Sequence, residues 1–252
     1  MENKKKYLVA NWKMNPVSEK GAKKLAGEIA HGFSGLKRKK ALQIVLCPPF
    51  TYLATIKMRN YKDLQLGAQN CHFEDSGAYT GEISAKMLKS LNCQFVIVGH
   101  SERREYFGED SPLINKKIKA VLKNKLIPVL AVGEKEGESI KVVERQLKGA
   151  LKDISYSKAK NIIIAYEPVW AIGTGHAATA DDVMGASIMI RRVLADLYSR
   201  AIADKVPILY GGSTDSKNIS RFTKDAGMDG ALVGGSSLNA KEFIKMAQEI
   251  VK

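Results

Sequence analysis

The sequence is poor in cysteine and has no long apolar run. Its three cysteines, Cys47, Cys71 and Cys93, are an odd number without Cys-x-x-Cys spacing, which argues against a disulfide framework and a zinc site. No stretch approaches the roughly 20 apolar residues that span a bilayer, and the first residues lead directly into a strand pattern instead of a signal peptide. We therefore expect reduced thiols, no membrane association and a cytoplasmic protein.

Positive charge, in contrast, is abundant. The formal net charge is +14, and the excess lysines are scattered through helical stretches such as 22–24 and 115–119. This scatter favours a solvated surface over a nucleic-acid-binding face, so no nucleic-acid partner is expected. Electrostatic steering of an anionic substrate is compatible with the charge but is not specified by it.

Short apolar runs recur along the whole chain and are too short for typical core helices. Their apolar residues are continuous, which is typical of strands covered on both faces, as in a parallel sheet with helices outside. The sequence therefore predicts eight buried strands, at Tyr7–Asn11, Leu42–Leu46, Leu64–Ala68, Phe95–Gly99, Leu126–Val132, Asn161–Tyr166, Val206–Tyr210 and Gly230–Gly234.

Amphipathic segments separate these runs and give units of roughly 30 residues, as in βαβ crossovers. Eight such units predict an α/β protein with a closed (β/α)8 barrel of parallel strands ringed by helices. A single domain over residues 1–252 fits the length, and no linker interrupts it. Helices are expected at Ser18–Ala30, Ile83–Leu91, Pro112–Lys123, Glu138–Leu151, Ala180–Tyr198, Ser216–Lys224 and Ala240–Val251, with Ser111 as a cap before Pro112.

Reactive residues of such a barrel belong at the carboxyl ends of its strands. Lys13 follows the first strand and is a candidate anion binder, although an ordinary solvated lysine is the alternative. His100 follows the fourth strand and is succeeded at once by Ser101, Glu102 and two arginines. An apolar strand that ends in five polar residues indicates an active-site cluster, and a short helix from Ser101 would keep His100 neutral.

The sixth strand ends at Glu167, which is followed by a segment of mixed apolar residues and glycines that suits a lid. Pro168 would stiffen its start, Trp170 and Ile172 would exclude water, and Gly173 would turn a backbone N–H towards an anion. Paired glycines then follow the last two strands, at 211–212 and 234–235, where this fold commonly binds phosphate.

These segments together resemble the triosephosphate isomerase family over essentially the whole chain. The motifs stand in the family's order, namely N-W-K-M-N, G-A-Q-N, V-G-H-S-E-R-R, Y-E-P-V-W-A-I-G-T-G, Y-G-G-S and L-V-G-G-S. The resemblance implies a TIM barrel that interconverts dihydroxyacetone phosphate and D-glyceraldehyde 3-phosphate through an enediolate, in glycolysis and gluconeogenesis, without metal or organic cofactor.

The resemblance also implies the catalytic roles. Glu167 would be the base and His100 the electrophile, and Asn11 and Lys13 would hold the substrate and the developing oxyanion. Glu102 would organise Lys13 and its neighbours. A glutamate base, a neutral histidine and lid closure are the known pattern of this family.

Binding and support residues are implied in the same way. The phosphate would be bound by N–H groups at Gly173, Ser213, Gly234 and Gly235, with Ile172 and Leu232 clamping the carboxylate. Further residues would act on the lid: Ser101 holds Glu167 while the lid is open, Glu134 holds Trp170, and Tyr210 bonds the backbone near Ala178.

The family is usually dimeric, and this implies a homodimer formed through the loop at residues 70–82, with Thr80 contacting the partner. Two positions depart from the family pattern. His176-Ala177-Ala178 replaces a lid hinge that usually carries a lysine and a threonine, which affects lid kinetics, and Ala131 replaces a cysteine after strand five, which affects packing.

Two other readings are open to the sequence. Another barrel acting on a sugar phosphate, such as a pentose-phosphate epimerase, would share both glycine pairs but not the set of Asn11, Lys13, His100 and Glu167. A basic barrel that binds nucleic acid or protein would explain the charge but not this set.

Overall fold

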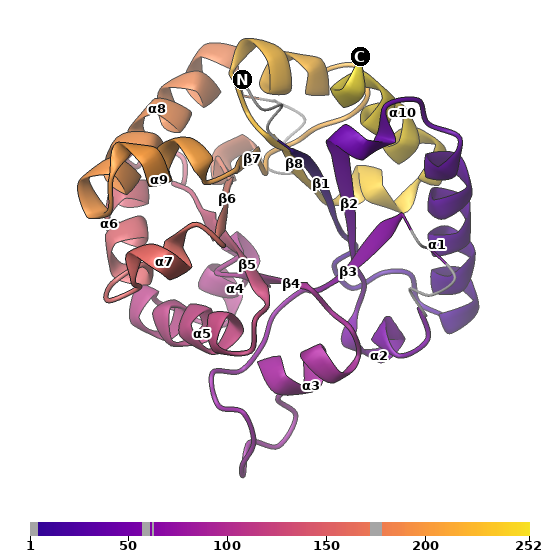
Figure 1. The fold of residues 1–252 in the computed structure, drawn as a ribbon, viewed down its shortest axis with the longest axis horizontal. Helices are drawn as coiled ribbons and strands as arrows, with labels where there is room; N and C mark the ends of the chain where they lie inside the picture. Colours follow the sequence, from indigo (N-terminus) through magenta and orange to yellow (C-terminus); the bar gives the residue numbers. More distant parts are fainter. Residues whose placement is uncertain (1–4, 57–60, 62, 172–177) are drawn as a thin grey trace.

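Eight parallel strands form a closed barrel, in which each strand pairs with its neighbours in chain order and β8 pairs with β1 (Figure 1). The computed structural model describes residues 5–56, 61, 63–171 and 178–252. The predicted (β/α)8 barrel is confirmed. The strands are β1 (Lys6–Asn11), β2 (Leu42–Cys47), β3 (Leu64–Ala68), β4 (Phe95–Val98), β5 (Ile127–Val132), β6 (Ile163–Tyr166), β7 (Ile208–Tyr210) and β8 (Gly230–Val233).

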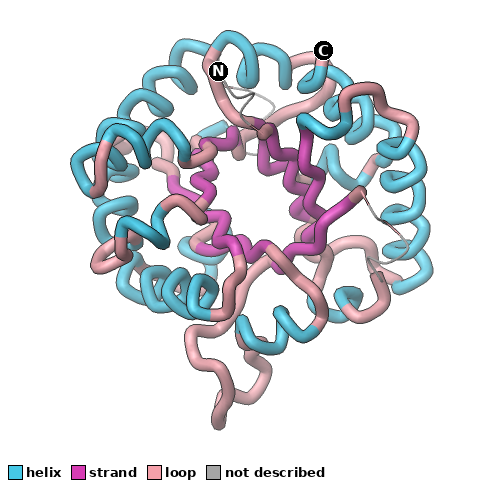
Figure 2. Tube along the Cα trace, viewed as in Figure 1, coloured by secondary structure: helices cyan, strands magenta, loops and turns pink. Residues whose placement is uncertain are grey.

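Helices surround the strands on all sides (Figures 1 and 2). The longer ones are α1 (Glu19–Ser34), α5 (Ser111–Lys123), α6 (Lys141–Ala150), α8 (Ala180–Leu197) and α10 (Ala240–Val251). The shorter ones are α2 (Phe50–Leu53), α3 (Ala85–Ser90), α4 (Ser101–Tyr106), α7 (Tyr156–Ala159) and α9 (Arg200–Lys205). Among the described residues, no helix is both long enough and apolar enough to cross a bilayer.

Local signals explain most helix starts, although the helices expected from Ile83 and Glu138 begin at Ala85 and Lys141. Asp110, not Ser111, caps α5, because its carboxylate accepts a hydrogen bond from the backbone N–H of Leu113 (2.9 Å). The segment 216–224 forms only a short irregular helical stretch that ends in a π-helical turn at Arg221–Asp225.

The core has two layers, which explains why the strands are apolar on both faces. On β1, Val9 points into the barrel interior, whereas Leu8 and Ala10 pack against the surrounding helices. Ala131 is fully buried in the interior layer. The barrel closes at Gly230, where φ is +141° and a Cβ atom would lie 1.7 Å from the carbonyl oxygen of Tyr7.

The segment between β3 and α3 extends well away from the barrel (Figures 1 and 2). It contains residues 70–82, in which the ring of His72 stacks on Phe73 (4.3 Å between ring centroids) and contacts the tilted ring of Tyr79 (4.4 Å). Thr80 is exposed near its end. Met14 and Val17, in the segment after β1, are also exposed, by 89% and 94%. These apolar side chains leave unburied surface beside the carboxyl end of β1.

Candidate active site

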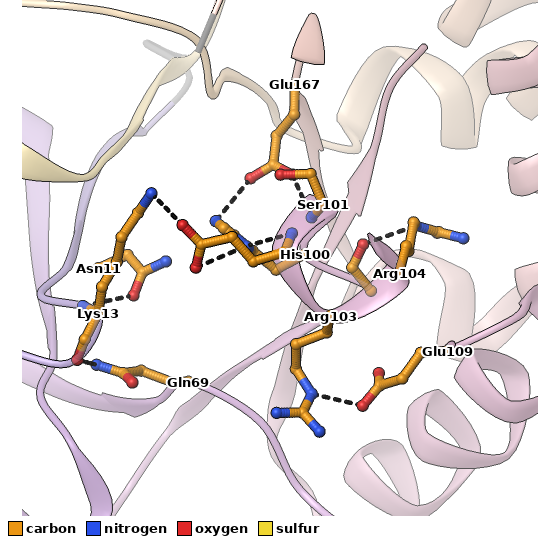
Figure 3. A network of polar contacts seen from close by, with 11 residues as sticks. Asn11, Lys13, Gln69, His100, Ser101, Arg103, Arg104, Glu109 and Glu167 are labelled. Atoms are coloured by element: carbon orange, nitrogen blue, oxygen red, sulfur yellow. Dashed lines mark hydrogen bonds and ion pairs between the residues drawn. The ribbon is translucent and has the colours of Figure 1, made fainter. Parts of the chain in front are cut away.

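The carboxyl ends of β1, β4 and β6 bring four of the predicted residues to one cavity. Asn11 ends β1, Lys13 follows it, His100 follows β4 and Glu167 follows β6, and all four line a cavity of about 260 Å³. Three of the four are nearly buried: Asn11 is 5%, His100 7% and Glu167 2% exposed. Figure 3 shows the side chains of Lys13, His100 and Glu167 converging on the same space.

Lys13 is held in a strained backbone conformation, with φ at +52°. Its N–H donates to Asn11 Oδ1 (3.1 Å) and its carbonyl accepts from Gln69 Nε2 (2.8 Å). Its ammonium Nζ lies 2.5 Å from Glu102 Oε1. The strained backbone and these three contacts fix one position for the positive charge at the rim of the cavity (Figure 3).

The local hydrogen bonding of His100 selects its tautomer. His100 is the N-cap of α4, and its Nδ1 accepts a hydrogen bond from the backbone N–H of Glu102 (3.2 Å). A ring nitrogen that accepts carries no proton, so the proton of the neutral ring is on Nε2. Nε2 lies 3.3 Å from Glu167 Oε1, and the imidazole therefore presents an N–H donor to the cavity.

Glu167 is positioned from both ends. Its Oε2 accepts a hydrogen bond from the backbone N–H of Ser101 (2.9 Å), and its own N–H donates to the carbonyl of Val132 (2.8 Å). A Cβ atom at Gly211 would lie 2.7 Å from Glu167 Cγ, so the glycine makes room for the carboxylate. Glu167 thus sits between β5 and β7 with a carboxylate oxygen beside the imidazole.

Glycine-rich segments after the last two strands complete the lining of the cavity. This part of the lining contains residues 211–214 after β7, Leu232 and residues 234–236 after β8, which include the predicted Ser213, Gly234 and Gly235. The hydroxyl of Ser236 donates to the carbonyl of Thr214 (2.8 Å) and ties the two segments together. Gly235 begins a short 3-10 helix, whose first N–H groups have no intrahelical partner and suit an anion.

The segment after Glu167 is anchored on Glu134. Glu134 Oε1 accepts from Trp170 Nε1 (3.0 Å) and from the hydroxyl of Tyr166 (2.8 Å), and its carbonyl accepts from the N–H of Val169 (3.0 Å). Pro168 begins this anchored segment, and its carbonyl accepts from the N–H of Ala171 (2.8 Å). Burial, together with the carboxylate of Glu134, raises the pKa of Tyr166.

Tyr210 lies close to the backbone of Ala178, after the segment that follows Glu167. Burial raises the pKa of Tyr210 to about 12, and the nearby backbone of Ala178 opposes this rise. Within the described part of the chain, the Tyr210 hydroxyl reaches no partner at full hydrogen-bond geometry. Ile172 and Gly173, together with His176 and Ala177, are outside the described residues.

Four residues of the site carry no predicted role. Thr214 and Ser236 line the cavity, and Gln69 holds the carbonyls of Lys13 (2.8 Å) and Cys47 (2.9 Å). Arg104 donates to the carbonyls of Gly99 (2.8 Å) and Ala131 (3.1 Å), and burial lowers its pKa to about 10. Gln69 was detectable as a polar residue directly after a strand, whereas nothing in the sequence marks Arg104 as a backbone support.

Together these features define a class of protein. A closed (β/α)8 barrel with a carboxylate, an imidazole and an ammonium group facing glycine-rich segments after β7 and β8 is a TIM-barrel enzyme with a site for a small phosphorylated substrate. The sequence profile of the triosephosphate isomerase family matches residues 6–250. The chain belongs to this family.

Curated relatives agree with the family profile. A triosephosphate isomerase of Dictyoglomus turgidum is 44% identical over 247 residues, which cover 95% of this chain and 97% of the relative. One of Dehalococcoides mccartyi is 46% identical over 248 residues, or 96% of this chain and 95% of the relative. One of Moorella thermoacetica is 41% identical over 242 residues, which cover 94% of this chain and 95% of the relative.

Proposed function

We propose that the chain is an intramolecular aldose-ketose isomerase that interconverts dihydroxyacetone phosphate and D-glyceraldehyde 3-phosphate, in glycolysis and gluconeogenesis. One observation carries the proposal. Glu167 Oε1 and His100 Nε2 lie 3.3 Å apart in a small cavity that is also lined by the glycine-rich segments at residues 211–213 and 234–235. A base, an acid–electrophile and an anion cradle are the groups this reaction needs.

The reaction removes a proton next to a carbonyl, and the enzyme must stabilise the resulting enediolate. Glu167 takes the proton from one carbon and returns it to the neighbouring carbon, while the hydroxyl proton passes from one substrate oxygen to the other beside His100 Nε2. The developing oxyanion accepts hydrogen bonds from His100 Nε2–H and the Lys13 ammonium, with Asn11 beside them. Glu102, ion-paired with Lys13 Nζ at 2.5 Å, orients that cation. No metal or organic cofactor takes part in these steps.

The remaining predicted residues bind phosphate or control access. Ser213, Gly234, Gly235 and Gly173 offer N–H groups to the phosphate, and Leu232 with Ile172 gives the carboxylate an apolar setting. The lid begins at Pro168 and closes over the substrate, with Trp170 leaving Glu134 as it moves. The hydrogen bond from Ser101 to Glu167 breaks in the same movement. Tyr210 bonds the backbone near Ala178, at the end of the lid.

The protein is further proposed to be a cytoplasmic homodimer of single-domain subunits, each using residues 1–252. The projecting segment 70–82 inserts next to the partner's site, and Thr80 contacts Asn11 and Glu102 there. The exposure of Met14 (89%) beside the site supports a partner surface on this side of the barrel.

Shortening the segment 70–82 to a tight turn is expected to yield a monomer that has lost most of its activity. The truncation removes the surface that inserts into the partner, and Lys13 then loses its neighbours across the interface. Light scattering measures the mass and a coupled assay measures turnover. A truncated protein that remained dimeric and fully active would contradict the proposed interface.

The test of the reaction itself is a glyceraldehyde 3-phosphate conversion assay with the purified protein. The Glu167→Gln variant, prepared identically, controls for contaminating isomerase. Rapid turnover by the wild type and a crippled variant are expected. Absence of turnover from a folded wild-type protein would refute the proposed activity.

A further inference from the structure

A side-chain amide of α6 is hydrogen-bonded to both polar groups of Gly133. Gln146 Oε1 accepts from the N–H of Gly133 (2.9 Å), and Gln146 Nε2 donates to its carbonyl (2.9 Å). A paired amide of this kind reproduces the contacts that a neighbouring strand would make.

The neighbouring strand is missing at this level of the barrel. The register of β4 with β5 ends at Val98 and Leu130, and the chain then turns away at Gly99, where φ is +74°. Beyond this point, two side chains form hydrogen bonds with the backbone at the unpaired edge of β5. Arg104 donates to the carbonyl of Ala131 (3.1 Å), and Gln146 pairs with Gly133, two residues further.

Gly133 is in direct contact with the backbone of the proposed base. A Cβ atom at Gly133 would lie 1.7 Å from the carbonyl oxygen of Glu167, so the two backbones pack without any side chain between them. The residues on either side also bind this segment: the Val132 carbonyl accepts from the N–H of Glu167 (2.8 Å) and the Glu134 carbonyl from that of Val169 (3.0 Å). A shift of Gly133 would therefore move the backbone of Glu167.

Glu167 borders two cavities, so part of its surroundings is open space. It lines the main cavity of about 260 Å³ and also a second cavity of about 150 Å³, whose lining includes Gln146, Gly133 and Val169. Close packing normally fixes a buried side chain, but here two cavities adjoin it. Polar anchors must therefore set the position of the carboxylate.

We propose that Gln146 is a positioning residue for the reaction. By fixing Gly133, it keeps the backbone of Glu167 at the place where the carboxylate lies beside His100. The inference rests on the proposed role of Glu167 as the base. Gln146 touches no part of the cavity that receives the substrate, and its effect is on the placement of the base and not on phosphate binding.

The first test is Gln146→Met, which keeps the length of the side chain and removes both hydrogen bonds. Because a misplacement of about 1 Å can cost up to about 100-fold in rate, we expect kcat to fall by about tenfold or more. The KM and the inhibition constant of inorganic phosphate should stay within about twofold of the wild type, since the segments after β7 and β8 are untouched. Asn115→Leu is the matched control, because Asn115, on α5, donates from Nδ2 to the carbonyls of Ala150, the last residue of α6, and of Lys152 just beyond it (both 2.8 Å).

A second variant gives a readout that general destabilisation would not produce. In Gln146→Glu the ionised carboxylate cannot donate to the Gly133 carbonyl, whereas the protonated carboxyl has one donor and one acceptor in the same places. The ratio of its kcat to that of the wild type should therefore rise as the pH falls towards about 5, as the introduced carboxyl becomes protonated. A ratio that did not change with pH would overturn the proposal.

Glu167→Asp, measured alongside, distinguishes the role of Glu167 as the base from the positioning role of Gln146. A slow Glu167→Asp variant with near-normal kcat in Gln146→Met would refute the positioning role and leave the base in place. Normal turnover in Glu167→Asp would refute the base itself, and the positioning role with it. An equal loss of kcat in Asn115→Leu and Gln146→Met would also overturn the proposal, because the effect would then be one of stability.

Discussion

Glu167→Asp is expected to turn over triose phosphate more slowly by about 10²- to 10⁴-fold, the usual contribution of a positioned general base. The substitution withdraws the carboxylate by one methylene, away from His100 Nε2, which lies 3.3 Å from Glu167 Oε1. The backbone proposed to bind phosphate is not altered, so KM should change far less than kcat. Steady-state kinetics in both directions of the reaction measures the two effects.

A matched control exists on the surface of α6. Glu144 is ion-paired with Lys148 (2.7 Å) on the surface of the helix, and Glu144→Asp makes the same chemical change away from the cavity. It should leave kcat unchanged. Near-normal turnover of Glu167→Asp would eliminate Glu167 as the base and would direct attention to the other carboxylate near the imidazole, Glu102.

His100→Gln and His100→Asn are expected to lower kcat by different amounts, with the larger loss at about 10²- to 10³-fold. The two ring nitrogens have separate tasks: Nδ1 accepts from the N–H of Glu102 (3.2 Å) and Nε2–H faces the cavity. A glutamine amide reaches close to the position of Nε2 and retains some donation to the oxyanion. An asparagine amide reaches only the position of Nδ1, so the asparagine variant should be the slower one.

The two His100 variants are compared with the wild type by their kcat values and by the pH dependence of kcat. His31→Gln is the control, because His31 lies on the exposed surface of α1 and its side chain is remote from the cavity. Wild-type rates in both His100 variants would rule out an electrophilic role for the imidazole. A slower glutamine than asparagine variant would contradict the assignment of the donor to Nε2.

Strand positions were predictable because short, continuous apolar runs mark them in the sequence. A strand covered on both faces is apolar at most positions, and Leu64–Ala68, with Gln65 as its one polar residue, was predicted to the residue. Helix boundaries were less predictable where caps compete. Both Asp110 and Ser111 are good caps, and only the contact of the Asp110 carboxylate with the N–H of Leu113 decides between them.

The location of the site was also predictable, for a topological reason. Parallel strands all end at the same face of a barrel, so polar residues that follow different strands must meet there. Asn11, Lys13, His100 and Glu167 do meet at one cavity. Their roles in catalysis remain predictions that the variants above test.

What the sequence could not reveal are the contacts made by residues remote from strand ends. The positive φ of Lys13 depends on Gln69, 56 positions away in the chain. Gln146 lies in the middle of a polar helix, and neither its neighbours nor its periodicity distinguish it from a solvated glutamine. Its pairing with Gly133 follows from where β4 leaves β5, which is a property of the closed barrel and not of any local pattern.

The two tryptophans of the chain make the proposed lid optically observable without a label. Trp12 is completely buried, in the core layer that packs against the surrounding helices. Trp170 is only partly buried and donates its indole N–H to a carboxylate. The intrinsic fluorescence of the native protein therefore combines one buried emitter outside the proposed lid with one emitter at its start, and closure of the proposed lid can be followed in the unmodified protein.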